Sequence, residues 1–307
     1  HMKTLCDKGV FVFKKWQLVP KDALILPTIW VYRIKVEKFK ARLCCLGNQA
    51  PDADGVYETA APVVRTTTWK LMFAVAVKVN LVIGGIDLEA GFCQTKPQRP
   101  IYLRMPSGVS MQQVDGSVGD GLLYCNFNLF GMPEAPHDLY GAVSNHILAY
   151  GLVKSTFDCC LYHWPSDDSR WKTNPLFVFT HVDDIKTVSS DEDRQAFNTY
   201  FKTKYDVEDL GVNARWQGIE CNRTEAGLYL TQTRHIDTLV ERAGLTNETG
   251  PGCNIKVPIR DIRLTKDMSP KTDADRLFMQ TTGKKYRELT GGLCWLAGMT
   301  RYDIAYA

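Results

Sequence analysis

The sequence lacks several patterns that assign a chain to a class at once. None of its ten cysteines forms a C-x-x-C pair, and none of its six histidines has H-x-x-x-H or H-x-E spacing, so the spacing rules predict no zinc site. The longest apolar stretch, residues 71–86, is broken by Lys78 and Asn80, which excludes a membrane-spanning helix there. No signal-peptide pattern or repeat occurs. We therefore expect reduced thiols in a cytosolic or nuclear setting.

The charge of the chain is unevenly distributed. Residues 1–50 contain ten Lys or Arg against three acidic residues, a net charge of +7, while the whole chain has only +3. The remaining 257 residues therefore carry −4. A basic end on a nearly neutral body suits phosphate binding, although a solvated basic surface explains the same asymmetry.

Periodicity predicts a mixture of strands and helices. Alternation indicates a basic hairpin over residues 29–45, and further strands are expected at 81–88, 101–105, 122–127, 160–164, 176–181, 185–188, 216–221 and 228–231. Helical spacing indicates helices at 63–80, 136–150, 190–204, 233–243 and 284–299. Because strands and helices do not strictly alternate, we expect the α+β class.

Three aspartates at predicted strand ends are the candidates for chemistry. Asp183 and Asp184 lie at a hairpin tip in an apolar segment, and Asp87 ends another apolar strand. Paired carboxylates repel each other unless a cation neutralises them, and Mg²⁺ prefers oxygen ligands. Adjacent strand residues point to opposite faces, so one of the pair must be secondary to the other. A simple turn that uses Asp for local hydrogen bonds is the alternative.

Ordered blocks along nearly the whole chain carry a resemblance. They are WQLVPKD, IWVYRIKVEKFKARLCCLGNQ, YETAAPVVRTTTWKLMFAVA, IDLEAGF, YLRMPSG, LFGMPEAPHDLY, FTHVDDI, LGVNARWQGIE, LYLTQTRHIDTLVERAGL and YRELTGGLCWLAGMTRYDIAYA. In this order they resemble the reverse transcriptases of copia-type LTR retrotransposons. The resemblance implies an RNA- and DNA-templated DNA polymerase, which adds dNTPs to a primer 3′-hydroxyl on an RNA template, a DNA primer or an RNA–DNA hybrid.

The resemblance also implies roles for individual residues. Asp87 and Asp183 would hold two Mg²⁺ ions, for which Mn²⁺ can substitute, in two-metal nucleotidyl transfer. Asp184 and the backbone carbonyl of Leu88 would support them. Further positions match nucleotide-binding and primer-positioning residues of the family, namely Lys40, Arg42 and Phe92 for the nucleotide and Gln217 and Gly218 for the primer.

Some of these roles have simpler alternatives. Phe92 matches the aromatic residue that excludes a ribose 2′-hydroxyl, and a core aromatic is the less favoured alternative. Lys40 and Arg42 could be general phosphate contacts rather than clamps on the triphosphate. Gly218 would let the backbone approach the primer strand.

The fold implied by the resemblance is a right-hand polymerase with an antiparallel palm sheet that carries the aspartates. The expected subdomains are fingers at 1–62 and 96–136, palm at 63–95 and 137–232, and thumb with the start of a connection at 233–307. No RNase H carboxylate set occurs in the chain. The resemblance implies a location in cytoplasmic virus-like particles and in the nucleus, and no membrane partner.

The chain departs from the family pattern at three positions. Pro133 stands in place of a lysine, Glu134 in place of a glutamine and His181 in place of an aromatic residue. A lost cation and a gained anion beside the template–primer would weaken phosphate affinity. The rival hypothesis is therefore a decayed or repurposed element that binds nucleic acid with little or no polymerase activity. A two-metal nuclease is a third and less favoured hypothesis.

Overall fold

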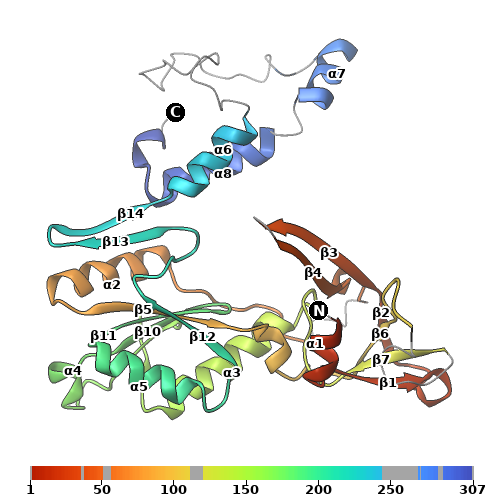
Figure 1. Cartoon of the computed structure of the whole chain (residues 1–307), viewed down its shortest axis with the longest axis horizontal. Coiled ribbons are helices and arrows are strands. Elements are labelled where there is room, and N and C mark those ends of the chain that lie inside the picture. The colour runs from red at the N-terminus through yellow and green to blue at the C-terminus, as the bar shows by residue number, and fades with distance from the viewer. Residues whose placement is uncertain are drawn as a thin grey trace. The chain divides into compact units, whose positions relative to one another are not determined.

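The computed structural model describes residues 2–35, 38–50, 57–110, 120–243, 269, 271–282 and 286–305 (Figure 1). Its strands and helices form an α+β chain, as the sequence predicts. The chain divides into two compact units, His1–Val212 and Asn213–Ala307. Each unit is described by itself. The predicted subdomain boundaries at 62, 95, 136 and 232 stay a prediction.

A six-stranded antiparallel sheet is the largest element of the first unit. Its strands lie in the order β12–β5–β11–β10–β9–β8, so the four strands from β8 to β11 follow one another in sequence and β5 lies between β11 and β12. The strands are β5 (Val82–Leu88), β8 (Val153–Lys154), β9 (Leu161–His163), β10 (Phe177–His181), β11 (Asp184–Ser189) and β12 (Val207–Val212). The central strands β5 and β11 are buried along most of their length because helices cover both faces of the sheet.

Three longer helices cover this sheet (Figure 1). α2 (Thr66–Lys78) lies on one face, where the ring of Phe73 is 6.1 Å from that of Phe179. α3 (Ala135–Ala149) and α5 (Asp191–Phe201) lie on the other face, together with the short α4 (Arg170–Thr173). Apolar side chains of α3 and α5 form one core with those of the strands. Ser190 caps α5 by accepting a hydrogen bond of 3.1 Å from the backbone N–H of Asp193.

A second sheet of the first unit has four strands in the order β1–β7–β6–β2. These are β1 (Phe11–Lys15), β2 (Leu24–Leu26), β6 (Ile101–Arg104) and β7 (Gly121–Cys125), and only β2 and β6 pair in parallel. α1 (Met2–Asp7) packs beside it, and Leu5 joins its core. β3 (Thr28–Lys35) and β4 (Lys38–Cys45) form a separate antiparallel hairpin, as predicted. Residues 36 and 37 lie outside the described part of the chain.

The second unit consists of a hairpin and helices. β13 (Glu220–Thr224) pairs with β14 (Gly227–Thr231), and the helices are α6 (Thr233–Arg242), α7 (Asp273–Thr282) and α8 (Tyr286–Met299). α6 packs against α8 at Leu239, where a Cβ on Gly292 would overlap the leucine side chain. No helix among the described residues is both long and apolar enough to span a bilayer.

Most predicted elements are confirmed to within a few residues, and one is wrong. The strand expected at 216–221 begins only at Glu220, because Trp216 and Ile219 close a tight turn before it. The sequence predicted none of β1, β2, β8, β12, α1, α4 and α7. The first two residues of the helix expected at 284–299 lie outside the described part of the chain.

Candidate active site

Two of the three candidate aspartates face each other across a strand pair. In the antiparallel ladder of β11 and β5, Asp184 is the direct partner of Asp87. Residues opposite each other in such a ladder project from the same face of the sheet. Glu208 of β12 pairs with Asp87 on its other side, so three acidic residues lie in one row across the sheet.

Asp183 lies in the two-residue turn between β10 and β11. His181 pairs with Asp184, which leaves Val182 and Asp183 as the turn residues. Val182 has a φ of 58°, and such left-handed geometry costs a β-branched residue about 1–3 kcal/mol. The carbonyl of Asp183 accepts a hydrogen bond of 3.3 Å from the backbone N–H of Leu88, which ties the turn to the end of β5. The strained turn therefore holds Asp183 beside Asp87.

Burial and electrostatic repulsion raise the pKa values of Asp184 and Asp87. Burial, followed by the charges of Asp183 and Asp87, raises the pKa of Asp184 to about 6, against the opposing effect of Lys186. Burial also raises the pKa of Asp87, and the charges of Asp183, Glu208 and Glu89 raise it further. The cluster therefore costs free energy when it is fully ionised, and this cost is what a bound cation would remove.

The residues present fit a hard divalent cation. Half-buried carboxylates offer the oxygen ligands that Mg²⁺ prefers. The ligand oxygens of Asp87, Asp183 and Asp184 are not all within 4.8 Å of one another. In the described part of the chain, the one set of three His, Cys, Asp or Glu side chains with ligand atoms that close is Asp158, Cys159 and Cys160. The observation that favours a cation is thus the raised pKa values, rather than a closed ligand cage.

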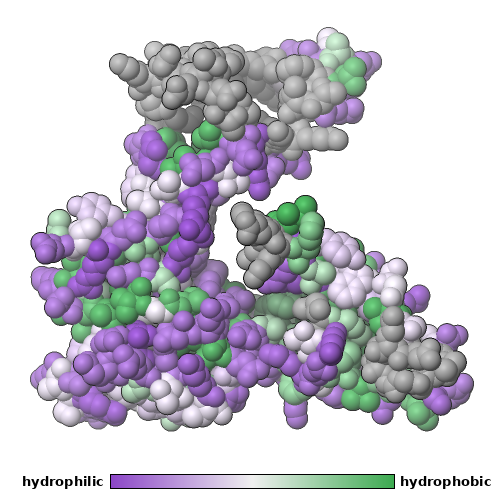
Figure 2. Space-filling model, viewed as in Figure 1, coloured by the Kyte–Doolittle hydropathy of each residue, from purple (hydrophilic) through white to green (hydrophobic). Residues whose placement is uncertain are grey.

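The predicted phosphate-binding residues lie on β4. The charge of Lys40, an exposed residue, lowers the pKa of Asp87, so its ammonium group acts on the aspartate cluster. The guanidinium carbon of Arg42 lies 4.8 Å from the centre of the Phe130 ring. Lys40 and Arg42 are alternate residues of one strand and therefore share a face. The same hairpin exposes Tyr32, Ile34 and Phe39, and Figure 2 shows hydrophobic residues gathered toward its tip.

Phe92 lies next to the aspartate cluster in the 3₁₀ turn Gly91–Gln94. Ala90, in the left-handed conformation with a φ of 53°, turns the chain into this segment. A Cβ on Gly91 would lie 3.5 Å from the Cβ of Asp183, so the segment passes directly beside the turn. The half-buried Phe92 ring contacts both hydrophobic cores of the first unit, and its centre lies 5.3 Å from that of Phe130. Phe92 therefore packs against the hydrophobic cores and also lies near the candidate active site.

The three departures from the family pattern have different surroundings. Glu134 is 2% exposed and forms an ion pair with Arg99, whose guanidinium carbon also lies 4.3 Å from the centre of the Tyr57 ring. The expectation that Glu134 adds an anion at a nucleic-acid surface is therefore wrong. Pro133 is half-buried and packs closely against Gly47. A Cβ added at Gly47 would lie only 2.6 Å from the Cδ atom of Pro133. Burial lowers the pKa of His181, the strand partner of Asp184.

Gln217 and Gly218 form a tight turn in the second unit. Both have positive φ, 50° and 80°, and Trp216 and Ile219 exchange backbone hydrogen bonds of 3.0 and 2.8 Å around them. A glycine suits this geometry because it has no Cβ, and Gly218 has open space around it. The role of this turn in primer positioning stays a prediction.

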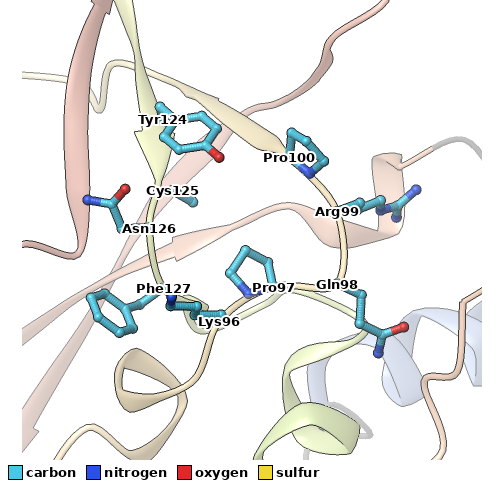
Figure 3. A pocket seen from close by; sticks show the side chains of 9 residues that line it. All are labelled: Lys96, Pro97, Gln98, Arg99, Pro100, Tyr124, Cys125, Asn126 and Phe127. Carbon is cyan, nitrogen blue, oxygen red and sulfur yellow. The ribbon is translucent and has the colours of Figure 1, made fainter.

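A pocket of about 500 Å³ in the first unit contains none of the predicted site residues (Figure 3). It is lined by residues 96–100 and 124–127. The side chains of Gln98 and Arg99 point away from Pro97 at its centre. Gln98 donates a hydrogen bond of 2.7 Å to Asp138, and Arg99 pairs with Glu134. Gln98 and Arg99 therefore connect this segment to the start of α3.

Three residues at the candidate active site were not predicted from the sequence. Lys186, which is 1% exposed, lies two residues after Asp184 on the same face, and a lysine inside the apolar strand was the available signal. Glu208 and Phe130 left no such signal, because they are far from Asp87 and Phe92 in sequence and meet them only through strand pairing and packing.

Comparison with known proteins supports one family. The family model described as "Reverse transcriptase (RNA-dependent DNA polymerase)" matches residues 13–259. The chain is 24% identical over 319 residues to "Retrovirus-related Pol polyprotein from transposon TNT 1-94" of Nicotiana tabacum, covering 100% of this chain and 23% of the relative. It is 27% identical over 304 residues to "Retrovirus-related Pol polyprotein from transposon RE1" of Arabidopsis thaliana, covering 95% and 19%. The chain thus spans about a fifth of the length of these curated relatives. Because the family model matches well over half of it, the chain belongs to the reverse transcriptase family, and its relatives place it with the copia-type retrotransposons.

Proposed function

We propose that this chain is the polymerase portion of a reverse transcriptase, which extends a primer 3′-hydroxyl with deoxynucleotides on an RNA or DNA template. The observation that carries the proposal is the strand register that sets Asp184 opposite Asp87, with Asp183 in the adjoining turn. The family match supports the same class of reaction. Template RNA, primer and dNTPs are the partners that this proposal implies.

The right-hand arrangement belongs to the same proposal. Residues 1–62 and 96–136 would be fingers, 63–95 and 137–232 palm, and 233–307 thumb with the start of a connection. In that arrangement the six-stranded sheet is part of the palm and the β3–β4 hairpin is part of the fingers. The basic excess of residues 1–50 would then face nucleic acid or nucleotide phosphates.

Asp87 and Asp183 would hold two Mg²⁺ ions, with Asp184 and the carbonyl of Leu88 in support. Such ions lower the pKa of the primer hydroxyl and neutralise the leaving pyrophosphate. The chain contributes the charge that attracts them, because strand pairing keeps the carboxylates together despite repulsion. Lys40, which already acts on Asp87, would add positive charge for the nucleotide triphosphate.

Sugar selection would depend on Phe92 and its neighbour Phe130. The edge-to-face contact at 5.3 Å fixes one ring against the other, and Arg42 covers the second ring at 4.8 Å. A side chain held in this way presents a rigid wall to a nucleotide sugar. Phe130 would thus act as a positioning residue that links Arg42 on β4 to the sugar gate.

A second candidate function is nucleic-acid binding without polymerase activity. Pro133 and His181, which replace a lysine and an aromatic residue of the family pattern, favour it. The burial of Glu134 against Arg99 weakens it, because this carboxylate faces the protein interior. The clustered aspartates argue for the enzyme.

Asp183→Asn should abolish primer extension on an RNA template, with Mg²⁺ and with Mn²⁺. The carboxylate serves the reaction, whereas basic residues serve binding, so template–primer affinity should change no more than a few-fold. The exposed Asp167→Asn is the matched control and should extend primers at the parental rate. Extension by Asp183→Asn at that rate would show that the site assignment is wrong.

Asp184→Asn should stabilise the chain at neutral pH when divalent ions are chelated. The pKa of Asp184 is raised in the folded state, so its ionised form destabilises the fold above about pH 6 and this effect disappears as pH falls toward 4. After allowance for solvent screening, we expect a gain of about 1–2 kcal/mol at pH 7.5. Thermal melting from pH 4 to 8 measures it, and Mg²⁺ should stabilise the parental chain more than the variant. An equal Mg²⁺ effect on both would argue against a cation at Asp184.

Lys40→Ala with Arg42→Ala should flatten the salt dependence of RNA–DNA hybrid binding. Each phosphate contact that is lost reduces the slope of log affinity against log salt by roughly one. Fluorescence anisotropy over a salt series measures the slope. The exposed pair Lys202→Ala with Lys204→Ala, at the end of α5, is the control and should leave it unchanged. The same slope in both double variants would remove Lys40 and Arg42 from the phosphate path.

Phe92→Val should raise incorporation of ribonucleotides relative to deoxyribonucleotides. One extra heavy atom in a packed site costs about 1–3 kcal/mol, so the ratio of kcat/KM values should shift by about tenfold or more. Phe130→Ala should shift it in the same direction, and Phe130→Tyr should restore it, because a tyrosine ring keeps the edge-to-face contact.

Phe73→Val separates this effect from a loss of stability. Phe73 is a buried core residue of α2, so its replacement should lower the melting temperature and leave the sugar preference intact. If Phe92→Val behaves in the same way as Phe73→Val in both assays, Phe92 is a core residue only.

A further inference from the structure

A cluster of one carboxylate and two thiols lies outside the candidate active site. Asp158, Cys159 and Cys160 precede β9, and one ligand atom from each lies within 4.8 Å of the other two. Asp158 and Cys160 are 4% and 0% exposed, whereas Cys159 is exposed. The spacing rules for zinc sites require separated cysteines, so an adjacent pair escapes them.

The Asp158 carboxylate is buried without a cationic partner. Its two oxygens accept hydrogen bonds from the backbone N–H groups of Arg65, at 2.9 Å, and Cys160, at 3.0 Å. None of the ion pairs among the described residues includes Asp158. Each carboxylate oxygen has a further lone pair free for a ligand. A buried carboxylate of this kind is costly unless a positive charge compensates it.

The thiols select the kind of cation. The sulfur atoms of Cys159 and Cys160 both lie beside the Asp158 carboxylate, so the cluster offers two soft ligand atoms and one hard one. Mg²⁺ prefers oxygen ligands, whereas Zn²⁺ and Cd²⁺ bind sulfur.

We propose that Asp158, Cys159 and Cys160 bind one thiophilic divalent cation of the Zn²⁺ type, with water at the position open beside Cys159. The carbonyl of Cys160 accepts a hydrogen bond of 3.1 Å from Thr180 at the end of β10. The carbonyl of Thr180 accepts one of the same length from Val64, just before α2. A bound ion would therefore lie beside the backbone hydrogen bonds that join Cys160 to β10 and β10 to the segment before α2. Thr180 of β10 is three residues before Asp183. The proposal does not depend on polymerase activity.

Cd²⁺ is a suitable probe because a cadmium–thiolate bond absorbs in the ultraviolet. The full chain, stripped of metal and reduced, should bind one Cd²⁺ per chain with this absorption. Cys159→Ser should weaken binding by at least about tenfold, and Asp158→Asn should also weaken it. The exposed, single Cys294 and the half-buried Cys44 of the other adjacent pair serve as controls, and serine at either position should leave binding unchanged. Cd²⁺ on the aspartates of the candidate active site gives no thiolate absorption.

Thermal melting provides a second readout with Zn²⁺ itself. Zn²⁺ should raise the melting temperature of the parental chain and leave that of Cys159→Ser unchanged, because binding to the folded state alone stabilises it. If Asp158→Asn fails to fold, Cys159→Ser decides the question, since an exposed side chain can be replaced without loss of core packing. Full Cd²⁺ absorption in Cys159→Ser, or an equal loss in Cys294→Ser, would overturn the proposal.

Discussion

The pairing of β5 with β11 forces like charges together, and the geometry of the candidate active site depends on this constraint. Asp87 and Asp184 are opposite each other, Glu208 continues the row, and Asp183 lies in a turn strained at Val182. Packing fixes the register, because a slip by one residue would exchange the different side chains that β11 buries on its two faces. Packing of the sheet between α2 and the pair α3 and α5 thus offsets the repulsion that raises the pKa of Asp184.

The surroundings of the aspartates connect separate parts of the sequence. Lys40 of β4 acts on Asp87 through its charge, while Arg42 of the same strand covers Phe130, which in turn contacts Phe92 beside Asp183. Positive charge for phosphates and a rigid aromatic wall are therefore next to the carboxylates. A binding-only element has no evident need for an acidic cluster that repels nucleic-acid phosphates, so this juxtaposition favours the polymerase over its rival.

Local signals in the sequence predicted much of the fold but little of its assembly. Periodicity found α2, β5, α3, α5 and the β3–β4 hairpin, because each has a continuous apolar face or an alternating pattern. It missed β12, because Glu208, Asp209 and Gly211 interrupt any apolar alternation there. This segment is a strand because it pairs with β5. Glu134 was placed at the surface because its burial depends on Arg99, 35 residues away. The aspartates were identified from their motifs, whereas Phe130 and Glu208 could be placed only through tertiary contacts.

The central claim is that strand pairing gathers Asp87, Asp183 and Asp184 to hold two divalent ions. Anomalous diffraction from crystals of the chain with an RNA template, a DNA primer, a non-hydrolysable nucleotide and Mn²⁺ tests it most directly. The account predicts two Mn²⁺ ions about 3.5–4 Å apart, both in contact with Asp87 and Asp183. A ternary complex with nucleotide bound and no Mn²⁺ at these aspartates would contradict it.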